Sequence, residues 1–277
     1  MGAFGSLSAA TSGLLAQSFA LQNISGNIAN SQTPGFKSLD TNFQALMDAQ
    51  MKGVPGGVRA ASAESNTMHG TIQTSSVATN MAISGNGYFS VEHPTTVGAG
   101  GQPSFAGAAQ EYTRRGDFQL DASGRLVNGD GNYLMEAPVD ANGNPTSGAP
   151  QPLQFNAASL PSGQGALQGI SIGTNGTIMG TFASGRQIAL ASVPLSGFRG
   201  EDFLKQNADG TVSATALSGA ALTTASGSVV GGSLESSNTD LVSELTAMIQ
   251  TQQAYSADTK IIATTSEMLQ TVTNMVV

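Results

Sequence analysis

Apolar side chains recur at every seventh residue near the beginning of the chain. An intermediate position of the repeat is occupied by Ala10, Gln17 and Ile24, of which only Gln17 is polar. A repeat of this kind is typical of a helix that packs along one stripe. It predicts a helix from Gly5 to Ala29, and Pro34 and Gly35 prevent its continuation. The predicted stripe consists of Leu7, Leu14, Leu21, Ile24 and Ile28.

The end of the chain has the same repeat over a longer stretch. Neither glycine nor proline occurs after Gly232, and Ser237 with Asp240 is typical of a capped helix start. We expect a helix from Asp240 to about Met275, roughly 50 Å long at 1.5 Å per residue. Its predicted stripe consists of Leu241, Leu245, Met248, Tyr255, Ile262, Leu269 and Val276.

The middle of the chain has a different pattern, in which glycine, asparagine and aspartate separate short alternating runs. This pattern is typical of strands joined by turns. The stretches 140–165 and 217–232 are rich in small residues and are interpreted as loops or insertion points. The predicted strands are 81–83, 88–91, 117–120, 125–127, 132–135, 177–179 and 187–190.

These elements predict an α+β fold, in which long N- and C-terminal helices pair as a coiled coil and an all-β body is inserted between them. The expected parts are the N-terminal helix (1–32), an extended connecting segment (33–75), the β body (76–232) and the C-terminal helix (233–277). The alternative is that both helices belong to an internal bundle of one domain. The expected length and low charge of the second helix favour packing in an assembly.

The composition suggests that much of the surface of the folded chain is covered by another molecule, and it excludes several kinds of partner. Charged residues are 10% of the 277 residues, against about 25% in ordinary soluble domains. The net charge is −8 and basic residues are not clustered, so a nucleic-acid partner is not expected. Cysteine is absent, which excludes disulfides and thiolate metal sites. No basic residue precedes Leu14, and no apolar run approaches the length of a membrane span, so we expect neither a cleavable signal peptide nor membrane insertion.

No set of residues predicts catalysis, a cofactor or a metal. The two histidines, His69 and His93, lack partners at metal-ligand spacing. The run from Asn128 to Asn132 has the first oxygens of a calcium loop but lacks its glycine and its final glutamate, and is interpreted as a turn. The adjacent Arg114 and Arg115 are interpreted as a surface pair. We therefore expect a protein that is not an enzyme.

Several stretches resemble one known family, the bacterial flagellar rod and hook proteins. The runs Met81–Phe89, Tyr112–Phe118 and Leu234–Leu241 are similar to the start of its β body, its first hairpins and the start of its C-terminal helix. The N-terminal signature of the family is matched by Asn27-Ile-Ala-Asn30 followed by Thr33-Pro-Gly-Phe-Lys37; its motif residues are Asn27, Asn30, Thr33, Pro34, Gly35, Phe36 and Lys37.

The resemblance implies a structural subunit of the flagellar axis that self-assembles helically and is exported unfolded by the flagellar type III apparatus. The partners it implies are further copies of the chain and neighbouring rod, hook-cap and junction proteins. The short segment from Lys37 to Met81 favours the extracellular hook, the tubular joint that passes motor torque to the filament around a central channel. The alternative is a distal or proximal rod subunit in the periplasm, and a second alternative is a secreted β-rich adhesin.

Overall fold

The computed structural model describes residues 3–47, 55–97, 102–139, 150–152, 154–155, 166–173, 176–207, 209–223 and 226–275. The chain forms two compact units. The helical unit consists of residues 1–31, 37–65 and 239–277, and the β body consists of residues 32–36 and 66–238. Most of the predicted loop 140–165, apart from 150–152 and 154–155, lies outside the described residues.

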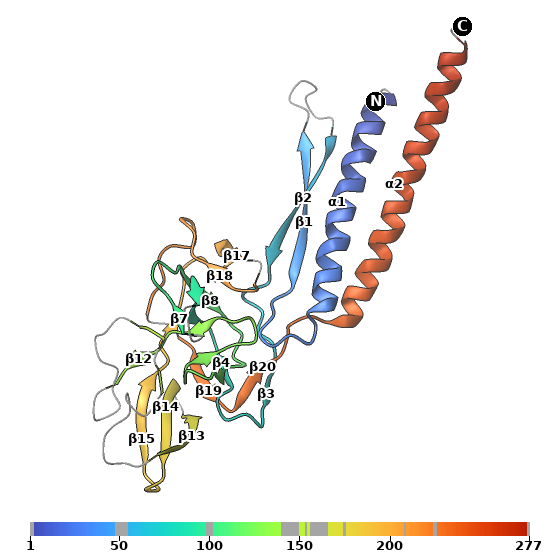
Figure 1. The fold of residues 1–277 in the computed structure, drawn as a ribbon. Coiled ribbons are helices and arrows are strands. Elements are labelled where there is room, and N and C mark those ends of the chain that lie inside the picture. Colours follow the sequence, from blue (N-terminus) through green and yellow to red (C-terminus); the bar gives the residue numbers. More distant parts are fainter. Residues whose placement is uncertain are drawn as a thin grey trace. The chain divides into compact units, whose positions relative to one another are not determined.

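The helical unit contains two long helices and one hairpin. Helix α1 (Ala3–Ala29) packs against α2 (Leu241–Met275) and also against the antiparallel strands β1 (Leu39–Met47) and β2 (Pro55–Glu64), as Figure 1 shows. Both helices therefore begin and end within two residues of their predicted limits. The carboxylate of Asp240 caps α2 by accepting hydrogen bonds from the backbone N–H groups of Val242 and Ser243.

The hairpin lies within residues 33–75, which are predicted to be an extended connecting segment. Phe43 on β1 stands opposite Ala60 on β2, and the pairing runs from Leu39 and Glu64 to Met47 and Pro55. Strand β2 is composed mainly of glycine, alanine and serine, which have little intrinsic preference for strands. Its pairing with β1 and packing against α1 override that weak preference, which explains why a pattern of residues alone does not predict it.

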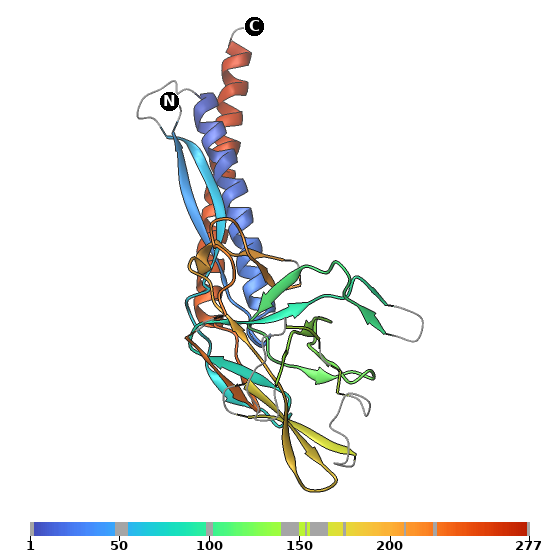
Figure 2. The same ribbon diagram turned by 90° about the vertical axis from the view of Figure 1, so that its left-hand side faces the viewer.

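The β body is a set of short antiparallel strands (Figure 2). Its largest sheet has the order β17-β18-β8-β5-β11-β10-β9, with β16 also paired to β5. These strands are β5 (Tyr88–Glu92), β8 (Gln110–Thr113), β9 (Gln119–Leu120), β10 (Leu126–Val127), β11 (Tyr133–Leu134), β16 (Leu195–Ser196), β17 (Lys205–Gln206) and β18 (Val212–Ser213).

A second sheet has the order β12-β15-β14-β13, and three strand pairs complete the described part of the body. The sheet contains β12 (Ala137–Pro138), β13 (Leu167–Ile172), β14 (Thr177–Phe182) and β15 (Gln187–Ser192). The pairs are β4 (Met81–Ser84) with β19 (Ser228–Gly231), β3 (Ile72–Thr74) with β20 (Ser233–Glu235), and β6 (Thr96–Val97) with β7 (Pro103–Ser104). A short 3-10 helix, η2 (Glu201–Phe203), precedes β17.

Each predicted strand of the middle region overlaps an observed one. The interpretation of 217–232 as a loop is wrong at its end, because β19 pairs with β4 and buries Val229. The partner strand is more than a hundred residues away in sequence, so the local composition of glycine and serine conceals the pairing.

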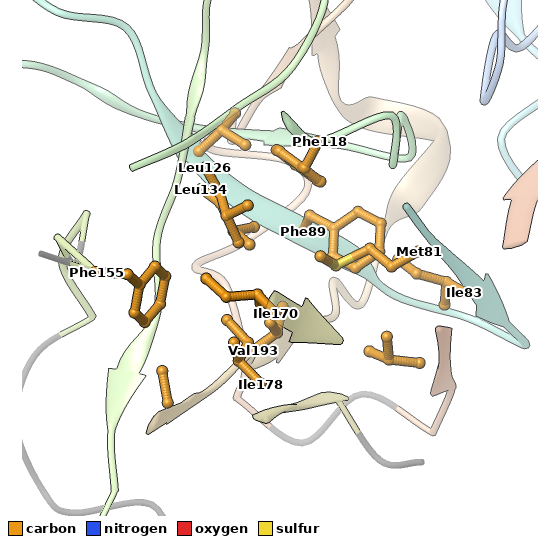
Figure 3. Close-up of a cluster of buried hydrophobic side chains, with 13 residues drawn as sticks. Met81, Ile83, Phe89, Phe118, Leu126, Leu134, Phe155, Ile170, Ile178 and Val193 are labelled. Carbon is orange, nitrogen blue, oxygen red and sulfur yellow. The ribbon is translucent and has the colours of Figure 1, made fainter. Parts of the chain in front are cut away.

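One hydrophobic cluster holds the sheets of the body together (Figure 3). The ring of Phe89 meets that of Phe118 edge to face, with centroids 5.7 Å apart. Each fully buried large side chain of this kind contributes about 1.5–3 kcal/mol through removal from water. The cluster comprises Met81, Ile83, Phe89, Val91, Phe118, Leu126, Leu134, Phe155, Ile170, Ile178, Ala191, Val193 and Val229.

Candidate functional site

Small side chains line the packed face of α1. Ala10, Ala16 and Ala20 are buried, and Gly13 faces the carboxylate of Asp258 on α2. Small residues allow the two helices to approach closely. Ala10 lies at a predicted position of the repeat, whereas Gly13, Ala16 and Ala20 were not predicted, because a heptad pattern highlights large apolar residues. Of the predicted stripe, Ile24 is buried, and the half-buried members are Leu7, Leu14, Leu21 and Ile28.

Helix α2 packs against α1 along one face and leaves much apolar surface exposed. Met248, Ile262 and Leu269 of the predicted stripe are half-buried, and Thr265 is the buried residue of the helix. Val276 lies outside the described residues. The exposed members of the stripe are Leu241, Leu245 and Tyr255, and other exposed apolar residues of the helix are Val242, Ile249, Ile261, Met268, Val272 and Met275. These nine residues lie on both sides of the stripe that packs against α1, and we call them together the open face of α2.

Exposed apolar side chains of this number are unusual on a helix that has to remain in water. Beyond its first turn the helix has only three charged residues, Asp258, Lys260 and Glu267. A helix with an apolar face on each side is typical of a buried position. The open face therefore suits contact with another protein surface better than contact with solvent.

Asn27, from the first motif, joins three elements of the helical unit. Its Nδ2 donates to Glu244 Oε1 at 2.8 Å and to the carbonyl oxygen of Leu39 at 3.0 Å, and its Oδ1 accepts from the backbone N–H of Leu39 at 2.8 Å. The side chain is 1% exposed. One amide thus fixes α1, β1 and α2 to each other, a role that its place on the last turns of α1 did not reveal. We call this contact set the Asn27 node.

Glu244 is the charged member of this node. Burial, followed by the nearby carboxylates of Asp40 and Asp240, raises the pKa of Glu244, and the hydrogen bond from Asn27 opposes that rise. Asn30 contributes more locally, since its Nδ2 donates to the carbonyl oxygen of Gly26 at 3.0 Å in the last turn of α1.

The Thr33–Phe36 stretch forms a tight turn within the β body. The backbone N–H of Phe36 donates to the carbonyl oxygen of Thr33 at 3.3 Å, and that of Gly35 donates to the carbonyl oxygen of Glu235 at 2.8 Å. Gly35 has a φ of +68°, and a Cβ atom there would lie 2.6 Å from the carbonyl carbon of Arg114. Glycine is therefore required by both conformation and space. Pro34 and Phe36 are half-buried, and Lys37, in the helical unit, is buried.

Arg114 and Glu235 form a buried ion pair beside this turn. Arg114 Nη1 lies 3.2 Å from Glu235 Oε2, and both side chains are 1% exposed. Glu235 Oε1 accepts from the backbone N–H of Gly70 at 3.0 Å, and Arg114 Nη2 donates to the carbonyl oxygen of Gly85 at 2.7 Å. The guanidinium lies over the ring of Tyr88, 5.5 Å from its centroid. We call these contacts the Arg114–Glu235 node.

The interpretation of Arg114 and Arg115 as a surface pair is wrong for Arg114. Only Arg115 lies near the surface, where it binds the carboxylates of Asp117 at 2.7 Å and Asp130 at 2.6 Å. Arg114 is buried because a carboxylate 121 residues away neutralises it. A sequence pattern has no signal for a partner at that separation.

The run from Asn128 to Asn132 is a turn between β10 and β11, as predicted. Asn128 Oδ1 accepts from the backbone N–H groups of Asp130 and Asn132, which is how asparagine stabilises a turn. Burial raises the pKa of Asp130, although Arg115 opposes that rise. Within the described residues, no group of three or more acidic or histidine side chains is placed to bind a metal ion.

The described helices include none with the length and apolar character needed to cross a membrane.

Three family models match successive parts of the chain. "Flagella basal body rod protein" matches residues 7–37, "Flagellar hook protein FlgE/F/G D1 domain" matches 82–180, and "Flagellar basal body rod FlgEFG protein C-terminal" matches 230–275. The Asn27 node and the turn at Gly35 involve residues of the first match. The second match contains Arg114, and the third contains Glu235.

Individual relatives agree with these matches. The chain is 30% identical to the flagellar basal-body rod protein FlgG of Caulobacter vibrioides, over 95% of this chain and 96% of the relative. It is 28% identical to the FlgG rod protein of Bacillus subtilis, over 92% of both chains. The flagellar hook protein FlgE of Brucella abortus is 33% identical over 58% of this chain and 38% of its own length.

The chain belongs to the family of flagellar basal-body rod and hook proteins. It is a structural subunit of the flagellar axis, and members of this family are components of an assembly and not enzymes.

Proposed function

We propose that this chain is a rod subunit that polymerises helically in the flagellar axis. The observation that supports this most strongly is the extent of similarity. The rod protein of Caulobacter vibrioides matches from end to end, whereas the hook protein of Brucella abortus matches over little more than a third of its own length. A match that covers nearly all of both chains supports the rod more than a match to a minor part of a hook protein.

This proposal replaces the expectation of a hook subunit. That expectation relied on the shortness of the segment from Lys37 to Met81. The segment instead contains the long hairpin β1–β2 from Leu39 to Glu64, which packs against α1. A segment that builds its own structural element is not a minimal connection, so its length gives no reason to prefer the hook.

The open face of α2 gives the proposed assembly its driving force. When a neighbouring subunit covers the face, each large apolar side chain contributes about 1.5–3 kcal/mol. Contact between different patches of identical subunits, repeated by a rotation that does not close, produces an open helical polymer. In this proposal α1 and α2 form a coiled coil in the polymer, with the predicted stripe residues at its seams, and line a central channel.

The subunit is exported unfolded by the flagellar type III apparatus, and neighbouring rod, hook-cap and junction proteins contact the ends of its polymer. The rod location is periplasmic. The scarcity of charge in the two helices, with no charged residue in α1 and four in α2, agrees with helices that neighbours cover after export.

Immunogold labelling of purified flagellar basal bodies with attached hooks tests the proposal. Antibodies raised against the β body are expected to label the straight rod and to leave the curved hook unlabelled. An antibody against the hook protein of the same cells is the control. Labelling of the hook would overturn the assignment to the rod, and labelling of neither structure would favour the adhesin alternative.

A further inference from the structure

Three segments of the β body lead directly into the helical unit along the chain. These are residues 32–36, the stretch that starts at Asn66 and the stretch that ends at Asn238. Every force that passes along the backbone between the two units has to pass through them. The contacts that the three segments make with each other within the β body therefore determine whether they move together or separately under such a force.

Backbone hydrogen bonds join these segments in pairs. Besides the bond from Gly35 to Glu235, the N–H of Ser236 donates to the carbonyl oxygen of Thr71 at 2.9 Å. Asn238 donates twice, from its backbone N–H to the carbonyl oxygen of Phe36 at 3.3 Å and from its Nδ2 to the carbonyl oxygen of Met68 at 3.1 Å. The stretch that ends at Asn238 thus lies between the other two and contacts both.

The buried pair of Arg114 and Glu235 anchors this arrangement to the rest of the body. Glu235 contributes its carbonyl oxygen to the first segment and its Oε1 to Gly70 of the second, while its Oε2 binds Arg114. Arg114 follows β8 directly, and its Nη2 holds the carbonyl oxygen of Gly85 after β4. One carboxylate therefore couples the connecting segments to the core strands.

The backbones at the Arg114–Glu235 node are packed so closely that two positions have no room for a side chain. A Cβ atom on Gly70 would overlap the carbonyl oxygen of Ser236, as one on Gly35 would meet the backbone of Arg114. The backbone of Gly70 is thus in direct contact with that of Ser236, and the backbone of Gly35 with that of Arg114. Four stretches that resemble the family separately, at 33–37, 81–89, 112–118 and 234–241, each contribute a residue to this one node.

We propose that Arg114 and Glu235 are positioning residues that clamp the three connecting segments into one mechanical element, so that torque reaches the β body through a single stiff junction. The statement about torque rests on the proposed rod function, while the clamp itself does not. Without the ion pair, the pairing of β3 with β20 and the hydrogen bonds between the connecting segments remain, but they lose the charged anchor that ties them to the core strands. We therefore expect loss of the ion pair to loosen the connecting segments more than the core of the β body.

Hydrogen exchange on the purified chain tests the clamp. Glu235→Gln keeps an oxygen for the N–H of Gly70 but removes the charge that neutralises Arg114. We expect amide exchange of Gly35, Gly70 and Ser236 to become about tenfold faster or more, with exchange at Phe89 in the core unchanged. Asp130→Asn, which removes a carboxylate from the neighbouring Arg115, is the matched control and is expected to leave all four amides as they are.

Two results would overturn the clamp. Unchanged exchange at the three connecting amides would mean that the pair does not hold them, and an equal acceleration at Phe89 would mean that the pair only stabilises the whole body. If Glu235→Gln does not fold, Arg114→Lys tests the anchor to the core strands instead, since lysine keeps a charge for Glu235 but has no second nitrogen for the carbonyl oxygen of Gly85, and the same three amides are expected to exchange faster.

Cells that carry Glu235→Gln test the mechanical consequence. We expect flagella to assemble in normal numbers but to show a larger elastic twist under load when a bead is attached to a flagellar stub, compared with Asp130→Asn cells. A normal twist would exclude the role in torque. Immunogold labelling decides the rod assignment independently, because exchange in the isolated chain does not depend on where the chain is located in the cell.

Discussion

Asn27 and Glu244 are 217 residues apart in the sequence, and Asn27 Nδ2 donates to Glu244 Oε1 at 2.8 Å. This bond connects the end of α1 to the first turn of α2. The same amide exchanges two hydrogen bonds with the backbone of Leu39 at the start of β1. The asparagine is thus the point where the three elements of the helical unit are fixed to each other, and its side chain has the donor and acceptor that this position needs.

Asn27→Ala should destabilise the helical unit by about 1–3 kcal/mol, because it leaves the part-buried N–H of Leu39 without its acceptor. Asn42→Ala, at an exposed asparagine of β1, is the control and should change stability by less than about 0.5 kcal/mol. Urea unfolding followed by the helical circular dichroism signal measures both variants. Equal unfolding midpoints for the two variants would show that the node contributes nothing.

Glu244 should make the stability of the helical unit depend on pH. Since burial raises its pKa, the folded chain holds the proton more tightly than the unfolded chain, and unfolding releases it. The free energy of unfolding should therefore fall as the pH rises from the ordinary glutamate value of 4.5 through the raised value. The loss of stability begins near the ordinary pKa of glutamate and is complete above the raised pKa of Glu244 in the folded chain.

Glu244→Gln should remove this dependence while retaining an oxygen for Asn27. Urea unfolding at a series of pH values, followed by helical circular dichroism, tests the expectation against Glu267→Gln, which removes an exposed carboxylate of the same helix. We expect the Glu267→Gln curve to follow that of the unchanged chain. If the free energy of unfolding of Glu244→Gln still falls over this pH range, another group causes the dependence.

Two glycines of α1 should respond in opposite ways to replacement by alanine. Gly26 has no neighbouring heavy atom within 4 Å of the position of a Cβ, so Gly26→Ala should stabilise the helix by about 1 kcal/mol. At Gly13 the new methyl group would lie 2.6 Å from Asp258 Oδ2, and the carboxylate has to move. Gly13→Ala should therefore gain less than Gly26→Ala or lose stability. An equal gain, measured by urea unfolding, would mean that the two helices are not closely packed there.

The sequence predicts the two helices well because each has a sustained period of seven and a clear boundary, such as Pro34 after α1. It predicts the short strands of the body through alternation and turn residues. It does not predict what depends on distant partners, including the burial of Arg114 by Glu235 and the pairing of β19 with β4. The role of Asn27 was missed for the same reason, since its motif marks the position but not the partners.

Gly35 should be less tolerant of alanine than another glycine with a similar backbone conformation. Gly131 has a φ of +85° and no heavy atom within 4 Å of the position of a Cβ, so Gly131→Ala should cost only the conformational strain, about 1–2 kcal/mol. Gly35→Ala adds an overlap with the backbone of Arg114, and should cost roughly 1–3 kcal/mol more. Urea unfolding followed by tyrosine fluorescence measures both, and equal costs would contradict the close packing of the turn.

Ile249 tests whether the open face of α2 drives polymerisation. Its side chain is 57% exposed, so Ile249→Asp should change the helical content of the subunit little. In a polymer the same position is covered, and a buried unpaired carboxylate costs several kcal/mol, which should prevent assembly. Gln250→Asp places the same charge on the next exposed residue of the helix and is the matched control.

Sedimentation and electron microscopy of the purified proteins compare the two variants with the unchanged chain. We expect Gln250→Asp to polymerise and Ile249→Asp to remain a folded subunit with unchanged helical circular dichroism. Polymers of Ile249→Asp that match those of the unchanged chain would exclude this face from the contact. Loss of helical signal in Ile249→Asp would instead mean that Ile249 supports α2 within the subunit, and the open face would then contribute to folding and not to assembly.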